Sequence, residues 1–490
     1  MPIHARQFVL GPNARKGSHD WKCLRLRDRL VLSYCPRLWV RQVTDKLGRC
    51  WVLLGMAVQS DSARGSPEDE LADFSRGDIA SVTESWAGRW ILIGEDQLYL
   101  DAGGLLGCYY LRQGGFWLSS SLALLTQIGG QEDPGSRRQQ LADNDGLGGD
   151  PPPRCCYRGI GKLLPTQRFD LRDGSVQPRQ PFSSAVAVRS YEELLAQMAD
   201  CLTATIRNVD GADRQLWVAL SAGYHSRLLL AAALRLGVDF RTYTQTFPMM
   251  LEADRDLPVE LAQAVGVEHF ARESRAEVAA LGERMDAHSH GQYVDVDRTF
   301  YARRQWEWSA PADVMLRGLG LELGQCYYWH LLPDRPAFDS VLAAFGAGQA
   351  PDYVKESLAD YLDWTASHPI PDMDWRDRWY LDMRLGGWLS AEEQALDLLE
   401  GRSFIPANSA RLYRLLLQVP VEVRRTNRHF IDLIDHLWPG LTAYPFNARD
   451  SFLRNTVRRV RKYAAIIHHS GARSASHQLG AALRRRLHRA

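Results

Sequence analysis

The order of apolar and polar positions divides the chain into two parts. Over residues 1–130, short apolar runs alternate with turn-forming Gly and Asp, as in RLVLSYC, CWVLLGMAV, GRWILIG, DQLYLDAGG, CYYLR and FWLSSSLALL. Runs of four to eight residues rich in Val, Ile, Leu, Tyr and Trp predict strands. Gly94-Glu95-Asp96 and Arg112-Gln113-Gly114-Gly115 are the expected hairpin turns. We therefore expect a strand-rich first part.

From Ser190 the spacing of apolar residues changes from short strand-like runs to a helical period. SYEELLAQMADCLTATIRNV has helical spacing and opens with a Ser cap. Strand-like segments then alternate with helical ones in the order QLWVAL, RLLLAAALRLG, FRTYTQTF, LPVELAQAVG, HFARES, RAEVAALGERMDAH and DVMLRG. This alternation predicts an α/β fold with a parallel sheet wrapped by helices. From about Tyr327 the pattern is mostly helical.

The predicted organisation is a domain at 1–180, a second at 185–450 and a tail at 451–490. Residues 129–155 are rich in Gly, Asp and Pro, which is typical of a linker or a long surface loop. The tail contains no Asp or Glu but many arginines, so it is predicted to contact an anionic surface or to remain a solvated tail.

Composition narrows the class of protein. Hydrophobic residues are 45% and charged residues 24%, as in ordinary soluble proteins. No apolar run approaches the ~20 residues that span a bilayer, and the first residues lack a secretory signal, so a cytoplasmic location is expected. The eight cysteines form no CxxC pair, which argues against a zinc site. With a net charge of +1, no specific nucleic-acid partner is predicted.

The candidate chemistry lies in the loop Ser221-Ala222-Gly223-Tyr224-His225-Ser226-Arg227, between a predicted strand and a predicted helix. Small residues let backbone N–H groups approach phosphate oxygens, and the helix amino terminus favours an anion. Ser221 and Ser226 can donate hydrogen bonds, and Arg227 adds a positive charge. The loop lacks Gly-Lys-Ser/Thr and so is not a Walker loop. An ordinary strand-to-helix turn is the alternative.

The loop resembles the SGGxDS pyrophosphate-binding loop of the asparagine-synthetase-like family. Three more segments resemble that family in the same order: residues 85–125 (the class II glutamine amidotransferase-like domain), 252–270 and 316–328. The resemblance implies a strand-rich, glutaminase-like (Ntn-type) α+β domain, followed by a doubly wound ATP-pyrophosphatase domain with a helical carboxy-terminal part. It covers most of residues 50–450.

The resemblance also implies roles for individual residues. ATP and its pyrophosphate would be held by the loop Ser221–Arg227, with the adenosine near Thr246, Phe247, Gly318 and Gly320. Asp256 and Glu322 would bind Mg²⁺, although each is also typical of a helix cap. Glu322 and Lys462 would be catalytic, since a late lysine stabilises the transition state in amide-forming relatives.

Three departures from the family shape the prediction. Met1 is followed by Pro2, so the amino-terminal cysteine of the glutaminases is missing. His225 replaces the loop aspartate, and an imidazole is a poor ligand for Mg²⁺. Leu319 and Leu321 stand where acidic residues are expected. The chain therefore resembles the glutaminase-deficient branch that includes beta-lactam synthetases and lasso-peptide cyclases.

The predicted function is ATP-dependent formation of an amide, lactam or isopeptide bond through an acyl-adenylate, in metabolite, peptide or glycan biosynthesis. The substrates would be a small-molecule or peptide carboxylate and an amine, and a biosynthetic partner protein is a further candidate partner. The alternative is a catalytically inactive relative that binds a partner. His288 and His290 suggest a metal site only if a further ligand converges. Trp375, Trp379 and Trp388, with Tyr380, are either core residues or a substrate-stacking surface.

Overall fold

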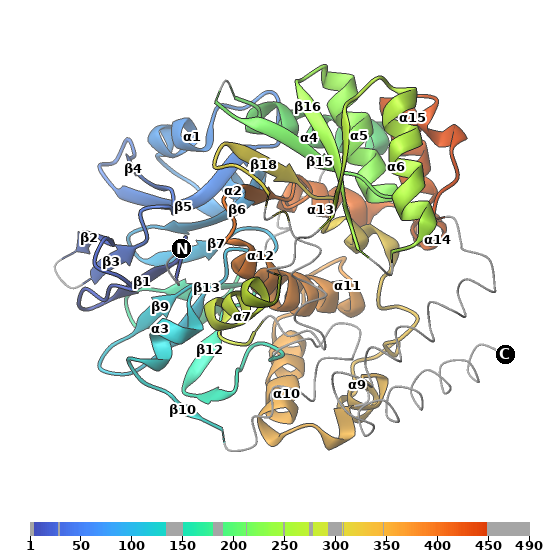
Figure 1. Cartoon of the computed structure of the whole chain (residues 1–490). Helices are drawn as coiled ribbons and strands as arrows, with labels where there is room; N and C mark the ends of the chain where they lie inside the picture. The colour runs from blue at the N-terminus through green and yellow to red at the C-terminus, as the bar shows by residue number, and fades with distance from the viewer. Residues whose placement is uncertain are drawn as a thin grey trace.

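The computed structural model describes residues 4–27, 30–133, 150–179, 190–211, 213–247, 250–273, 278–292, 306, 308–345 and 347–447. Within these ranges it is a mixed α/β structure, with antiparallel sheets in the amino-terminal region, a parallel sheet and carboxy-terminal helices (Figure 1). No helix in the described ranges is both long and apolar enough to cross a membrane.

Two six-stranded antiparallel sheets form the amino-terminal region. The first has the order β12 (Ile160–Lys162), β8 (Tyr109–Leu111), β9 (Trp117–Ser119), β1 (Phe8–Gly11), β3 (Leu30–Tyr34), β2 (Lys22–Arg27). The second has the order β14 (Val176–Pro178), β13 (Gln167–Asp170), β7 (Gln97–Leu100), β6 (Trp86–Ile93), β5 (Cys50–Gln59), β4 (Val40–Thr44). A short ladder joins β10 (Gln131–Glu132) to β11 (Tyr157–Arg158). The antiparallel pairs β6–β7 and β8–β9 confirm both predicted hairpins.

Alternation of side chains along the strands builds the core between these sheets. Val52 and Leu54 on β5 contribute to the core that also contains Phe8 and Leu10 of β1. Trp51 and Leu53, one position away, pack in a separate cluster with the helices α1 (Pro67–Asp73) and α2 (Ile79–Thr83). Because β5 is buried on both faces, its sequence is a nearly continuous apolar run. Helix α3 (Leu122–Thr126) packs beside β8 and β9.

The second part contains a five-stranded, all-parallel sheet, as the strand–helix alternation predicts. Its order is β17 (His269–Glu273), β16 (Phe240–Thr246), β15 (Gln215–Ala219), β18 (Asp313–Leu316), β19 (Arg402–Phe404). The strand β19 was not predicted. It has only three residues and follows a long helical stretch, so nothing in its local pattern distinguishes it from a loop.

Helices lie on both faces of the parallel sheet. Helices α4 (Tyr191–Val209), α5 (Tyr224–Leu236) and α15 (Arg428–Leu437) pack together, and α5 also packs against β15 (Figure 1). Helix α6 (Glu252–Ala264) packs against β16 and β17. The opposite face, which includes Trp217 and Met315, packs with residues of α7 (Val278–Ser289) and α12 (Ser390–Leu396).

The carboxy-terminal part is helical up to the last described residues. Its further helices are α9 (Phe338–Ala344), η2 (Ala347–Gln349), α10 (Asp352–Ser367), α11 (Trp375–Trp379), η3 (Tyr380–Leu389), α13 (Ala410–Gln418), α14 (Val421–Thr426) and η4 (Leu441–Ala443). The segment η3 is a π-helix that continues α11 and leads directly into α12. A wide π-helical turn inside a longer helix is often found at a functional site.

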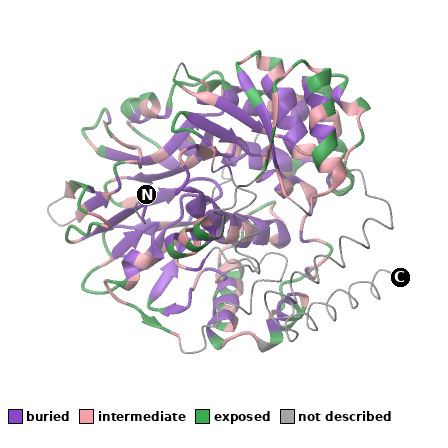
Figure 2. Cartoon of the chain, in the orientation of Figure 1, coloured by how far each residue is buried: buried purple, intermediate pink, exposed green. Residues whose placement is uncertain are grey.

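Buried polar contacts join the two parts. Arg89 of β6 forms a two-pronged ion pair with Asp397, with Nη–Oδ distances of 2.6 and 2.9 Å. The amide of Asn408 donates to Asp101 at 2.8 Å. The side chains at this junction are largely buried, as the purple centre of Figure 2 shows. The predicted boundary at 180–185 falls in a stretch outside the described residues.

The proline-rich segment differs from its prediction as a surface linker. Residues 134–149 lie outside the described part, but Pro151 and Pro152 are buried, and Arg154 forms ion pairs with Asp360 and Glu356 of α10. Cys155 and Cys156 in this segment are both buried and form no disulfide with one another. Tertiary packing against α10, which no local pattern records, buries this segment.

Candidate functional site

The loop at residues 220–223 follows β15, the strand at which the order of strand connections in the parallel sheet reverses. From β15 the chain proceeds through α5 to β16 and β17 on one side, and later returns to β18 on the other side of β15. The connections that leave β15 and β18 therefore diverge at the carboxyl ends of the two strands, and the region between these connections is called the crevice below. In open α/β sheets, ligands bind at such a switch point.

The two serines of the loop converge. Ser221 Oγ lies 2.9 Å from Ser226 Oγ, and the backbone N–H of Ser221 donates to Ser226 Oγ at 3.1 Å. The N–H of Gly223, which caps α5 without any side-chain bond, donates to Ser221 Oγ at 3.2 Å. The loop thus holds two hydroxyls and a helix amino terminus together, and its own groups satisfy one another.

An acidic residue holds the loop from the side of α6. The N–H of Ala222 donates to Asp254 Oδ1 at 3.0 Å. Asp256, the predicted metal ligand, is instead about half exposed and paired with its neighbour Arg255, whose hydrogen bond lowers the pKa of Asp256. Both acids lie in the first turns of α6, and only the direction of the helix decides which one faces the loop.

Arg227 has a different partner from the predicted pyrophosphate. Its side chain is fully buried, and its guanidinium donates to the carbonyls of Tyr444 and Pro445, each at 2.8 Å. The same group lies 3.9 Å from the centre of the Phe446 ring. Tyr224 stacks on the same Phe446 ring, with a distance of 4.7 Å between the two ring centres. Arg227 and Tyr224 therefore hold residues 441–446 against α5.

The opposite wall of the crevice follows β18. A Cβ added to Gly318 would lie 2.9 Å from the carbonyl carbon of His225, so only glycine lets this wall approach the start of α5. Gly320 has φ +84 and precedes the short helix η1 (Leu321–Gln325), which carries Glu322. The two predicted glycines thus position the wall of the crevice and the carboxylate on it.

His225, Glu322 and Tyr380 form a polar row across the crevice. His225 Nδ1 lies 3.7 Å from Glu322 Oε1, and the Tyr380 hydroxyl donates to Glu322 Oε2 at 2.9 Å. Burial lowers the pKa of His225 more than Glu322 raises it, so the imidazole is neutral at pH 7. The His225 ring meets Phe430 edge-on at 4.9 Å. This row brings the two loops that leave β15 and β18 into one site.

The role of Tyr380 beside Glu322 was missed by sequence reasoning. The sequence pattern predicts only a core or substrate-stacking role for Tyr380. Its position at the start of the π-helical segment η3 directs the hydroxyl to Glu322, and that segment has no sequence signature. Trp379 is fully buried, and Trp375 and Trp388 pack against the core, which favours the core interpretation for these three residues.

Thr246 is the last residue of β16 and Phe247 follows it, so both lie at the same end of the sheet as the loop that follows β15, because the two strands are parallel and adjacent. Thr246 Oγ1 donates to the carbonyl of Arg272 at 3.1 Å. Lys462 lies outside the described residues. Arg384 on η3 offers a cation near the crevice. Burial lowers its pKa, but nearby tyrosines and Glu322 raise it above the ordinary value.

The possible metal sites are limited by these contacts. Among the described residues, no group of three or more His, Cys, Asp or Glu side chains is placed to hold a metal ion. His288 is buried and accepts a hydrogen bond from the backbone of His4, whereas His290 Nε2 lies 2.9 Å from the Tyr157 hydroxyl. The histidine pair therefore does not converge on a common ligand.

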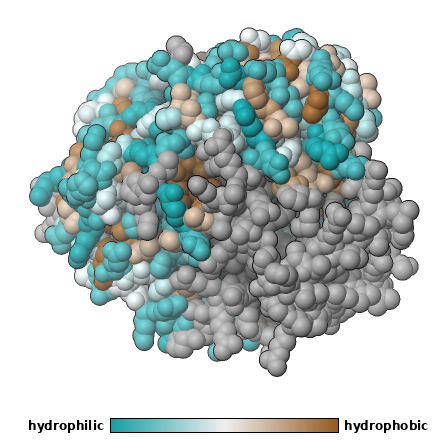
Figure 3. All heavy atoms as spheres, in the orientation of Figure 1, coloured by the Kyte–Doolittle hydropathy of each residue, from teal (hydrophilic) through white to brown (hydrophobic). Residues whose placement is uncertain are grey.

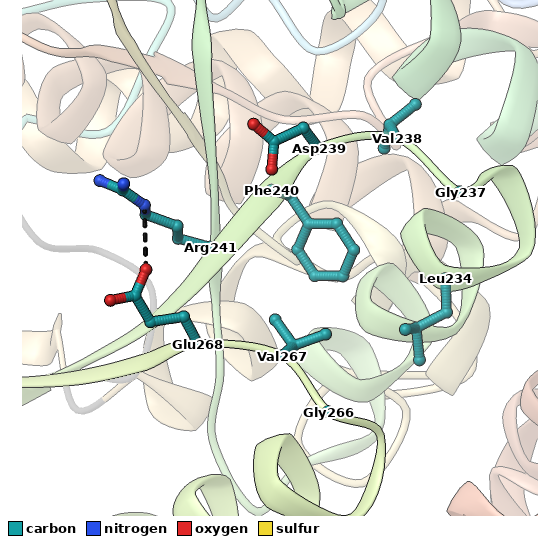
Figure 4. Close-up of a pocket in the computed structure, with 9 residues that line it drawn as sticks. All are labelled: Leu234, Gly237, Val238, Asp239, Phe240, Arg241, Gly266, Val267 and Glu268. Atoms are coloured by element: carbon teal, nitrogen blue, oxygen red, sulfur yellow. Dashed lines mark ion pairs between the residues drawn. The ribbon is translucent and has the colours of Figure 1, made fainter.

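The described surface has a shallow hollow at the other end of the sheet. It has a volume of about 410 Å³ and is lined by the turns that precede β16 and β17 (Figure 4). Arg241 pairs with Glu268 across it, with an Nε–Oε2 distance of 3.2 Å. Since these turns lie at the amino ends of the strands, the hollow is remote from the loop at residues 220–223. On the face shown in Figure 3, hydrophilic side chains predominate over the described part.

Comparison with known proteins gives no relative for this site, because no family model and no curated protein sequence matches the chain. The site is therefore defined by its geometry: a small-residue loop at the switch point of a parallel sheet, facing a carboxylate that a tyrosine holds.

Proposed function

We propose that the chain binds ATP in the crevice between β15 and β18 and uses it to form an amide bond through an acyl-adenylate, releasing pyrophosphate. The observation that carries the proposal is the convergence of Ser221, Ser226 and the amino terminus of α5 at the switch point of the sheet. Such a terminus favours the negative charge of a phosphate.

The architecture supports the same proposal at the level of the fold. Two stacked antiparallel sheets with helices outside them are compatible with a glutaminase-like domain of the Ntn type. A parallel sheet with helices on both faces is compatible with an ATP-pyrophosphatase domain. In this proposal a substrate amine, rather than ammonia from glutamine, attacks the acyl-adenylate and displaces AMP.

The loop would change its hydrogen bonds when phosphate binds. In the structure, Ser221 Oγ accepts from Gly223 N–H and contacts Ser226 Oγ. A pyrophosphate oxygen in the crevice would replace these internal partners and accept from both hydroxyls and from the N–H group. Arg227 would act at a distance, by holding residues 441–446 against α5.

Glu322 would orient the amine and take its proton as the new bond forms. The hydrogen bond from Tyr380 fixes the carboxylate, and the neutral His225 leaves its negative charge uncompensated on that side. Arg384 would provide the positive charge that opposes the developing negative charge of the transition state. The acid and amine substrates would be small molecules or peptides.

The described residues around the loop provide no group of three or more His, Cys, Asp or Glu side chains that could coordinate Mg²⁺. The carboxylates nearest the loop are Glu322 and Asp254, and Asp254 already accepts from Ala222 N–H. His225 offers Mg²⁺ a nitrogen where the ion prefers oxygen. Any magnesium would therefore be held mainly by the phosphates and water, and no step of the proposal depends on a protein-bound metal.

A second candidate is a non-catalytic protein with the same fold. The observation that favours it is that two charged side chains at the loop, Arg227 and Asp254, already form hydrogen bonds with backbone groups of the protein. In that case the crevice would be a structural feature, and the chain would act by binding a partner.

Calorimetric titration with ATP, in the presence of Mg²⁺, separates the two candidates. The ligase proposal predicts saturable binding that is lost in Ser226→Ala and retained in Ser81→Ala, a control at an exposed serine on α2. Absence of ATP binding to the unmodified protein would overturn the ligase proposal. For the chemistry, ATP–pyrophosphate exchange with a panel of carboxylic acids tests adenylation, and Tyr380→Phe should lower the rate of amide formation without changing ATP affinity.

A further inference from the structure

A group of arginines surrounds one indole ring where the two parts of the fold meet. The guanidinium of Arg402, the first residue of β19, lies 4.1 Å from the centre of the Trp39 ring. The guanidiniums of Arg214, next to β15, and Arg41, on β4, lie 5.3 and 5.7 Å from the same centre. Residues from both antiparallel and parallel sheets thus bring three positive charges to one site.

Two of these charges lack a carboxylate partner. Arg41 forms an ion pair with Glu68. Arg214 donates to the carbonyl of Val209 at 2.7 Å, and among the described residues neither it nor Arg402 forms an ion pair with an acid. Burial lowers the pKa of Arg402 to about 10; the charge of Asp397 opposes this shift, and the charges of Arg37 and Arg214 add to it.

A hollow opens beside this group. It has a volume of about 230 Å³ and lies between β4, β5, the start of α1 and the end of α4. Its lining includes Trp39, Arg41, Arg64, Glu68, Arg214 and Asn208. Arg41 is paired with Glu68 and Arg64 with Glu70, so Arg214 is the lining arginine that forms no ion pair within the described residues. Arg402 does not line the hollow but lies against Trp39, which does. The volume is below the roughly 300–1,000 Å³ of pockets for drug-sized molecules, so the hollow suits a small ligand.

We propose that this hollow is an anion-binding site for a small ligand of the phosphate class, held by Arg214 and supported by Arg41 and Arg402. The planar guanidinium of arginine binds phosphate oxygens with paired hydrogen bonds, and it keeps its charge in a partly buried position. A bound anion would neutralise the repulsion between Arg214 and Arg402. Because the lining comes from both parts of the fold, the ligand would also stabilise their contact.

Thermal unfolding in increasing concentrations of inorganic phosphate, at constant ionic strength set with chloride, tests this site. A ligand that binds only the folded state raises the melting temperature with a saturable dependence on its concentration. The unmodified protein should show this dependence. Arg214→Gln should weaken the apparent phosphate affinity by about tenfold or more, as expected for the loss of a charge-assisted contact. Arg402→Gln, which removes a charge behind Trp39 and not on the lining, should weaken it less.

Two control variants make the result specific. Arg235→Gln removes one positive charge from an exposed position on α5 and should leave phosphate binding unchanged. Ser81→Ala, at an exposed serine on α2, should also leave it unchanged. Lack of saturable stabilisation in the unmodified protein would overturn the proposal, as would a phosphate affinity of Arg214→Gln equal to that of the unmodified protein. Loss of the stabilisation in Ser226→Ala, with full retention in Arg214→Gln, would assign phosphate binding to the loop after β15 and would likewise overturn the proposal.

Discussion

Replacement of Arg227 by methionine tests whether this side chain holds the segment 441–446 against α5. Methionine keeps much of the length and apolar contact but cannot donate to the carbonyls of Tyr444 and Pro445. Burial lowers the pKa of Arg227 only to about 10, so the native guanidinium is charged at pH 7. The substitution therefore removes charge-assisted bonds and leaves buried carbonyls without donors.

The magnitude follows from the contacts. Each of the two 2.8 Å bonds contributes about 1.5 kcal/mol, the lower value for a bond to a charged group. The contact of the guanidinium with Phe446, at 3.9 Å, adds about 1 kcal/mol. Together they predict a loss of about 4 kcal/mol, which corresponds to a decrease in melting temperature of roughly 8 °C for a cooperative unit of about 250 residues.

Differential scanning calorimetry measures the decrease, and limited proteolysis reports on the segment itself. Arg227→Met should become sensitive to protease between Leu441 and Asn447, whereas Arg235→Met, at an exposed position on the same helix, should behave as the unmodified protein does. A decrease below about 2 °C, with an unchanged proteolysis pattern, would refute the assignment of Arg227 as the residue that holds this segment.

Three further predictions concern other contacts. Arg89→Met should lower the free energy of unfolding by about 3 kcal/mol in urea titration, because it leaves Asp397 buried without a partner. The double variant Arg89→Met with Asp397→Leu should recover part of the loss. An unchanged unfolding midpoint in Arg89→Met would contradict this prediction. Burial lowers the pKa of His288 from 6.5 to about 3, so the unfolded chain binds a proton that the folded chain excludes between those values. Stability should therefore fall as the pH drops below about 6.5, by up to about 1.4 kcal/mol per pH unit, and the slope of melting temperature against pH should be shallower in His288→Gln; equal slopes would contradict this. Gly318→Ala should push the wall of the crevice away from His225, cost about 1–3 kcal/mol and weaken ATP binding in calorimetry; unchanged stability would show that the contact can relax freely.

Local sequence patterns predicted much of the strand and helix content. The runs around β5 and β6 and the turns at residues 94–96 and 112–115 predicted strands and hairpins that the structure contains. The alternation after Ser190 predicted the parallel sheet and the position of the loop after β15. These signals are local, since apolar periodicity and turn residues act within a few positions of the chain.

Contacts between distant segments were beyond the reach of the local pattern. Asp254 rather than Asp256 meets the loop because the orientation of α6 turns one acid inward and leaves the other in solvent. Tyr380 reaches Glu322 from a π-helical segment that follows it by 58 positions. Neither contact has a signature in the residues next to it.

The sequence by itself determined most of the strands and helices, the parallel sheet and the position of a small-residue loop at the end of β15. Only the tertiary structure decided which charges remain available there. Arg227, two residues after His225, is occupied by backbone carbonyls of residues 441–445 and by that of Ala222 in the loop itself. The reason is physical: a buried guanidinium must find acceptors wherever the folded chain provides them, and the carbonyls of residues 441–445 lie more than 200 residues away along the chain.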